Sequence, residues 1–205
     1  MLINGKVRIA VLVSGGGTNL QALINAEKSG IIKSGSISLV LSNKAGAYAL
    51  TRAESAGIKT AVVCKKDFAT PREFEDRMIE ILDSEGIELI VLAGFMSILS
   101  AEFTNHFKDR IINVHPSLIP SFCGEGFYGL RPHIAALEYG VKVSGATVHF
   151  VNEVADGGRI IMQKAVEVLD NDTPEILQRR VMEEAEWIIL PAATEKISFE
   201  ILCSK

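Results

Sequence analysis

The feature that most restricts the fold of this chain is a pair of almost wholly apolar runs, at residues 7–13 and 87–93. Neither run alternates between apolar and polar residues, and the first is bounded by Gly5 and by the glycines at 15–17. A strand of this composition is buried on both faces, which is typical of the centre of a parallel sheet. Because parallel strands are joined by crossover helices, the two runs predict an α/β protein.

The spacing of apolar and breaker residues elsewhere completes this pattern. Further strands are predicted at residues 36–41, 59–63, 111–115, 142–151 and 159–169. Helices are predicted from Thr18 onward, at 47–56, 70–86, 101–110 and 132–139, and from 172, with Pro191 kinking or restarting the last one. The order predicts a single-domain, Rossmann-like open sheet, mostly parallel, with helices on both faces and an antiparallel C-terminal hairpin at one edge.

Composition excludes several classes of protein. The 205 residues are 48% apolar and 22% charged, which is enough for a full core in one domain. The net charge of −4, with both signs scattered, argues against a nucleic-acid or membrane surface. The three cysteines share no metal-ligand spacing, so we expect no metal and a reduced, cytoplasmic setting. The N-terminal apolar run is too short for a secretion signal or a membrane span.

Three consecutive glycines follow the first predicted strand, in the segment SGGGTN at residues 14–19. A strand followed by a glycine turn and a helix is typical of an anion-binding site. Glycines let backbone N–H groups approach a phosphate, and the helix start adds partial positive charge. The segment has no Walker lysine, and Leu20 stands in place of the last glycine of the dinucleotide pattern. A tight turn without a ligand is the alternative, but the polar residues Ser14, Thr18 and Asn19 favour phosphate.

A second candidate site lies at the end of the strand predicted at 111–115. Asn113 and His115 point to one face of an extended segment, and Pro116 ends the strand. These residues could merely cap the strand, but open α/β sheets bind ligands at the carboxyl ends of their strands. An amide beside an imidazole can move protons and stabilise an oxyanion, and a carboxylate such as Asp156 would stabilise the charged imidazole. Because no activated nucleophile is nearby, direct transfer between two bound substrates fits better than a covalent intermediate.

Five segments resemble the phosphoribosylglycinamide formyltransferase family, folate-dependent enzymes of purine biosynthesis. They are SGGGTNLQ at 14–21, LAGFMSILS at 92–100, INVHPSLIP at 112–120, GATVHFV at 145–151 and DGGRII at 156–161. HPSLIP and the DGG loop also resemble methionyl-tRNA formyltransferase and formyltetrahydrofolate deformylase. The former would need a C-terminal RNA-binding domain and the latter usually carries an N-terminal regulatory domain, and we expect neither here.

The resemblance implies a phosphate-binding half at about 1–110, a folate-binding and catalytic half at about 111–190, and a tail helix at 191–205. The family's catalytic positions match Asn113, His115 and Asp156. Its ribonucleotide contacts match Gly17, Thr18, Asn19 and Glu186. Its folate contacts match Arg72, Met96, Ser97, Ile98, Leu99 and Asn113. The implied substrates are 10-formyltetrahydrofolate, as formyl donor, and glycinamide ribonucleotide, bound by a monomer or homodimer that needs neither metal, nucleic acid nor membrane.

Some features depart from the family pattern or leave other functions open. Ser97 replaces a common arginine, Arg159 a common proline, and the glycine-rich loop at 121–131, a candidate lid, is longer than usual. His149 is expected to be a hydrogen-bonded structural residue. The alternatives are a formyltetrahydrofolate hydrolase and a phosphosugar-binding protein without catalysis. A nicotinamide oxidoreductase would need an acidic residue where the second strand ends in Ser42-Asn43.

Overall fold

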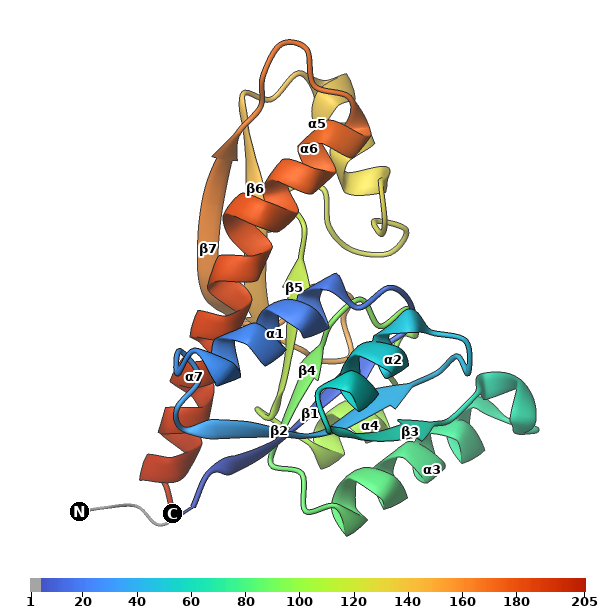
Figure 1. The fold of residues 1–205 in the computed structure, drawn as a ribbon. Coiled ribbons are helices and arrows are strands. Elements are labelled where there is room, and N and C mark those ends of the chain that lie inside the picture. Colours follow the sequence, from blue (N-terminus) through green and yellow to red (C-terminus); the bar gives the residue numbers. More distant parts are fainter. Residues whose placement is uncertain (1–4) are drawn as a thin grey trace.

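The computed structural model describes residues 5–205 as one seven-stranded sheet with helices on both faces (Figure 1). The strands are β1 (Val7–Val13), β2 (Gly35–Ser42), β3 (Lys59–Val62), β4 (Leu89–Leu92), β5 (Ile111–His115), β6 (Val143–Phe150) and β7 (Ile160–Glu167). Their order is β3-β2-β1-β4-β5-β6-β7, with β1 to β5 parallel and both β6 and β7 antiparallel to their neighbours. The predicted sheet and its antiparallel edge are confirmed. The first four residues of the N-terminal segment weighed as a secretion signal lie outside the described residues.

Within residues 5–205, seven α-helices connect and cover these strands. They are α1 (Thr18–Lys28), α2 (Tyr48–Ser55), α3 (Pro71–Ser84), α4 (Ala101–His106), α5 (Arg131–Tyr139), α6 (Pro174–Val181) and α7 (Trp187–Cys203). The predicted start of α3 is confirmed in detail: the Thr70 hydroxyl accepts the N–H of Glu73, and the Glu73 carboxylate accepts the N–H of Ala69. Figure 1 shows α6 and α7 packed along β6 and β7.

The core consists of two layers, one on each face of the sheet. In β1, the side chains of Val7, Ile9, Val11 and Val13 join the layer under α1, α2 and α7. Ala10 and Leu12 join the layer under α3 and α4. All six side chains are fully buried, which confirms that β1 is a central strand covered on both faces.

The C-terminal helices differ from the sequence-based expectation. The predicted tail helix at 191–205 begins four residues earlier, at Trp187, and Pro191 lies inside it. The irregular backbone is instead a π turn at Met182–Glu186, between α6 and α7. Proline removes the hydrogen bond to the carbonyl four residues back and its ring crowds that carbonyl, so its effect falls in the first turn of α7, beside the π turn. Within residues 5–205, no helix combines the length and apolarity needed to cross a membrane.

The parallel strands end along one edge, where the following loops carry most of the predicted site residues. The loops are joined by side chains. The backbone N–H of Met96, after β4, donates to the hydroxyl of Ser14, after β1, at 2.8 Å. The amide of Asn43, after β2, donates to the hydroxyl of Ser97 at 2.9 Å. The glycine turn and the loop at 94–99 are therefore held in fixed positions relative to each other.

Candidate active site

Asn113 and His115 lie at the carboxyl end of β5, on the face predicted for them. The antiparallel register pairs Asn113 with His149 and His115 with Thr147 on β6. The amide nitrogen of Asn113 lies 3.2 Å from Nε2 of His149. Nδ1 of His149 lies 2.8 Å from the Phe150 carbonyl, which can only accept, so Nδ1 carries a proton. In the neutral ring, Nε2 is then free to accept a hydrogen bond from Asn113.

Asp156 reaches the same volume from the loop between β6 and β7. One carboxylate oxygen lies 3.3 Å from Nδ1 of His115, and the other lies 3.4 Å from Nε2 of His149. The backbone of Asp156 is left-handed, with φ of 54°. Gly158 lets this loop approach β6, because a Cβ there would lie 1.7 Å from the carbonyl oxygen of Phe150. The sequence thus places a carboxylate between two imidazoles.

The loop predicted as a lid is bonded directly to this group. Nε2 of His115 donates to the carbonyl of Phe122 at 2.9 Å, and the N–H of Gly124 donates to the Asp156 carboxylate at 2.8 Å. Phe122 has a φ of 50°, an unfavourable value for a large side chain. Its ring packs edge-on against Tyr139 of α5 at 6.1 Å, which offsets part of that strain. The lid therefore covers His115, whose side chain is 5% exposed.

Burial and charge act in opposite directions on the two ionisable partners. Burial lowers the pKa of His115, and the Asp156 carboxylate and the Phe122 carbonyl oppose this shift only in part. Burial by itself raises the pKa of Asp156, but the neighbouring rings of His149 and His115 and the bond from the Gly124 N–H outweigh it, so the pKa is lowered. Burial therefore opposes the charged form of His115, whereas its neighbours favour the ionised form of Asp156.

The residues matched to ribonucleotide contacts come together from opposite ends of the chain. Gly17, with φ of 73°, precedes α1, and no side chain caps that helix. The amide of Asn19 donates to the carboxylate of Glu186 at 2.7 Å, and the hydroxyl of Thr18 contacts the sulfur of Met182 at 3.4 Å. Burial raises the pKa of Glu186, with the Asn19 bond opposing it. The π turn thus brings a buried carboxyl group to the start of α1.

The residues matched to folate contacts are not all in one place. Met96 and Ile98 are 51% and 74% exposed, so their apolar side chains are available to a ligand. Leu99 is buried in the layer under α3 and α4. Arg72 is in the first turn of α3, with its side chain 79% exposed and Asp76 as its charged partner. Met96, Ser97 and Ile98 therefore share one loop, whereas Arg72 comes from a helix.

His149 was expected to be a hydrogen-bonded structural residue, and its ring does lie within bonding reach of other groups, namely Asn113 and Asp156. Sequence analysis did not anticipate these two partners. The available signal was the antiparallel pairing of β5 with β6, which puts His149 opposite Asn113. The bonds of the Phe122 carbonyl and the Gly124 amide could not be predicted from the sequence, because every residue of a loop carries the same backbone groups. Across residues 5–205, no three His, Cys, Asp or Glu side chains are grouped so as to hold a metal ion.

This chain belongs to the formyl transferase family, a family of transferases, because the sequence model of that family matches residues 7–194. It is 45% identical over 184 residues to the phosphoribosylglycinamide formyltransferase of Haemophilus influenzae, which covers 90% of this chain and 84% of the relative. It is also 47% identical to part of the trifunctional purine biosynthetic protein adenosine-3 of Gallus gallus. That match covers 94% of this chain but only 18% of the longer protein.

Solved structures agree with the sequence matches. The glycinamide ribonucleotide transformylase 1 of Symbiobacterium toebii superposes with a TM-score of 0.89 at 40% identity, covering 95% of this chain and 89% of that one. The phosphoribosylglycinamide formyltransferase of Brucella melitensis superposes with a TM-score of 0.86 at 42% identity, covering 95% of this chain and 96% of that one. In both comparisons the likeness covers nearly the whole of this chain.

Proposed function

We propose that this protein transfers the formyl group of 10-formyltetrahydrofolate to the amine of 5-phosphoribosylglycinamide, a step of de novo purine biosynthesis. The observation that carries this proposal is the cluster at the carboxyl edge of β5, where Asp156 lies between His115 and His149 and the Asn113 amide lies beside them. Such a cluster offers hydrogen-bond donors and a proton relay but no nucleophile. It therefore suits direct transfer through a tetrahedral intermediate.

In this mechanism the substrate amine attacks the formyl carbon, and negative charge develops on the formyl oxygen. An amide group has two N–H donors, so Asn113 can bond this oxygen while it keeps its bond to His149. The developing charge also favours the imidazolium form of His115, which burial disfavours in the resting site. Asp156 holds that imidazolium and, through water, helps a proton pass from the attacking nitrogen to the folate nitrogen that leaves.

Binding is assigned to the two sides of this cluster. The phosphate of the ribonucleotide lies on Gly17, Thr18 and Asn19, at the open start of α1, and Glu186 contacts the same substrate. The folate ring lies against the loop at 96–99 and the loop before Asp156. Arg72, which comes from α3, contacts the more distant part of the folate. The enzyme acts in the cytoplasm as a monomer or homodimer and requires no metal.

The second candidate is a formyltetrahydrofolate hydrolase, which needs the same three catalytic groups but uses water in place of the amine. An absorbance assay of folate deformylation, run with and without glycinamide ribonucleotide, distinguishes the two candidates. We expect turnover only when the ribonucleotide is present. Equal turnover without it would select the hydrolase, and no turnover with either would select a binding protein.

A further inference from the structure

Two successive carbonyl groups of the glycine turn point toward α2. The carbonyl of Gly15 accepts the backbone N–H of Ala49 at 3.0 Å. The carbonyl of Gly16 accepts Nε–H of Arg52 at 2.9 Å. Because C=O and N–H point in opposite directions in a trans peptide, the N–H groups of Gly16 and Gly17 are directed away from α2. The contacts with α2 therefore set the direction in which this turn offers its donors.

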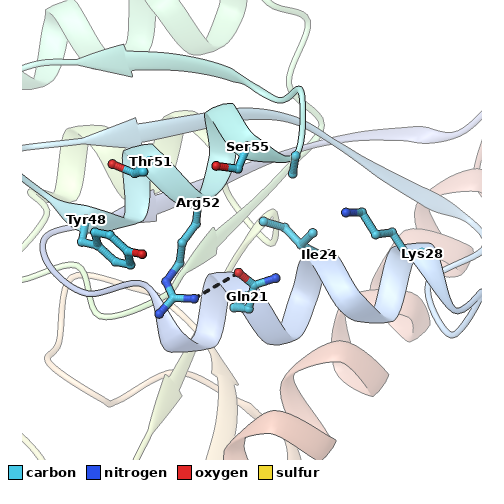
Figure 2. A pocket seen from close by; sticks show the side chains of 8 residues that line it. Gln21, Ile24, Lys28, Tyr48, Thr51, Arg52 and Ser55 are labelled. Carbon is cyan, nitrogen blue, oxygen red and sulfur yellow. Dashed lines mark hydrogen bonds between the residues drawn. The ribbon is translucent and has the colours of Figure 1, made fainter.

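Arg52 is itself held in place from several sides. Figure 2 shows it extending from α2 toward α1, where its guanidinium donates to the side-chain oxygen of Gln21 at 3.1 Å. The guanidinium carbon also lies 5.0 Å from the ring centroid of Tyr48. These groups line a pocket of about 190 Å³ between the two helices, together with Lys28. An arginine fixed in this way loses little further side-chain freedom when a ligand binds next to it.

The glycine turn and α2 approach each other closely at Gly17. A Cβ on Gly17 would lie 2.6 Å from Cβ of Ala49 and 3.4 Å from Cδ of Arg52, so α2 packs directly against the turn. A hydrogen bond from a cation to the Gly16 carbonyl also polarises that peptide, which makes the Gly17 N–H a stronger donor. The same guanidinium adds positive charge behind a turn that, with no side-chain cap on α1, keeps backbone donors available.

We propose that Arg52 is a positioning residue for the substrate phosphate: its bond to the Gly16 carbonyl aligns and polarises the Gly16–Gly17 peptide, so that the Gly17 N–H faces the phosphate. This role rests on the proposed function, in which the glycine turn holds the phosphate of the ribonucleotide. Arg52 acts through the backbone and contributes to binding of the phosphate rather than to formyl transfer. Its loss therefore affects KM for the ribonucleotide and leaves kcat nearly intact.

The test compares Arg52→Ala, Arg52→Lys and the wild-type protein with Lys28→Ala as a matched control, since Lys28 lines the same pocket. For Arg52→Ala we expect KM for the ribonucleotide to rise about tenfold, the scale of a lost charge-assisted hydrogen bond. We expect kcat to change less than about twofold, because the lost interaction stabilises the bound substrate and the transition state equally. Arg52→Lys keeps the positive charge but lacks the planar guanidinium, so its KM should lie between those of the wild type and Arg52→Ala. Lys28→Ala should have the KM of the wild type.

Two further readouts separate this role from general loss of structure. With the substrate analogue that lacks the phosphate, wild type and Arg52→Ala should share one KM. In a titration with inorganic phosphate followed by NMR, the Gly17 amide signal should shift in the wild type and much less in Arg52→Ala. An unchanged KM, an equal rise for the analogue, or an unchanged phosphate titration would overturn the role. If the wild type forms no product, the proposed function fails, whereas the phosphate titration still decides the role of Arg52.

Discussion

Nε2 of His149 lies 3.2 Å from the amide nitrogen of Asn113 and 3.4 Å from a carboxylate oxygen of Asp156. One buried ring thus contacts two of the three proposed catalytic side chains, which come from different elements. Its own orientation is fixed by the bond from Nδ1 to the Phe150 carbonyl at 2.8 Å. His149 is therefore placed to fix the rotamers of Asn113 and Asp156, two groups proposed to act on the substrate.

Replacing His149 with alanine should lower kcat about tenfold to a hundredfold, because small displacements of catalytic groups have effects of this size. KM for either substrate should change little. Steady-state kinetics measures both values, and His106→Ala serves as a control because that histidine lies on the exposed side of α4, paired with Asp83. A kcat for His149→Ala within twofold of the wild type would show that Asn113 and Asp156 are positioned without it.

Asn113→Ala and His115→Ala test the proposed catalytic groups directly. Each variant removes a donor to the developing oxyanion, a loss that typically raises the barrier by about 2.7–4 kcal/mol. We expect kcat to fall roughly a hundredfold or more, with the fold kept. Single-turnover rates measure the fall in catalysis, and circular dichroism spectra check that the fold is kept. Near-normal turnover in both folded variants would rule out the assignment of these roles.

The sequence predicted the structure best in the strands, where burial and side-chain direction follow a regular pattern along the chain. The two-faced apolar composition of β1 identified a central parallel strand, and the spacing of Asn113 and His115 identified a shared face. The approach of Asp156 to His115 was expected only from the resemblance and from their chemistry. No periodic signal links residues in β5 to a loop after β6, because that contact depends on sheet order and on the close packing of Gly158.

The helical irregularity near Pro191 shows a different limit. A proline marks a missing hydrogen bond, but not whether the helix accommodates it by a break or by a change in a neighbouring turn. Here the chain places a π turn at Met182–Glu186, where Glu186 meets Asn19. The tertiary contact and the turn arise together, so neither can be read from the sequence around Pro191.

Gly158→Ala should disrupt the loop that carries Asp156. The added methyl would lie 1.7 Å from the Phe150 carbonyl oxygen, so the loop must move away from β6. We expect a loss of about 1–3 kcal/mol in the free energy of unfolding, as for other overpacked sites. Activity should fall further than stability explains, because Asp156 moves with the loop. Urea unfolding and kinetics measure the two effects.

The control for that prediction is Gly46→Ala, since a Cβ at Gly46 meets no atom within 4 Å and its backbone is not left-handed. This variant should keep both stability and activity. If Gly158→Ala behaved like Gly46→Ala, the approach of the loop to β6 could not be what positions Asp156.

His133 should make stability depend on pH in the acid range. Its ring is fully buried, neither ring nitrogen bonds another group among residues 5–205, and burial, assisted by the charge of His115, lowers its pKa from 6.5 to about 4. Between these values the unfolded chain binds a proton that the folded chain does not, so the free energy of unfolding falls as pH falls. The difference corresponds to at most about 3 kcal/mol between pH 7 and pH 4.

His133→Leu removes this titration together with the two unpaired ring nitrogens of His133. We expect its free energy of unfolding to decline less steeply than that of the wild type between pH 7 and pH 4, as measured by urea unfolding at several pH values. Carboxylates such as Asp156 titrate in both proteins, so their contributions cancel in the comparison. Parallel slopes for the wild type and His133→Leu would mean that His133 is protonated as readily in the folded chain as in the unfolded one.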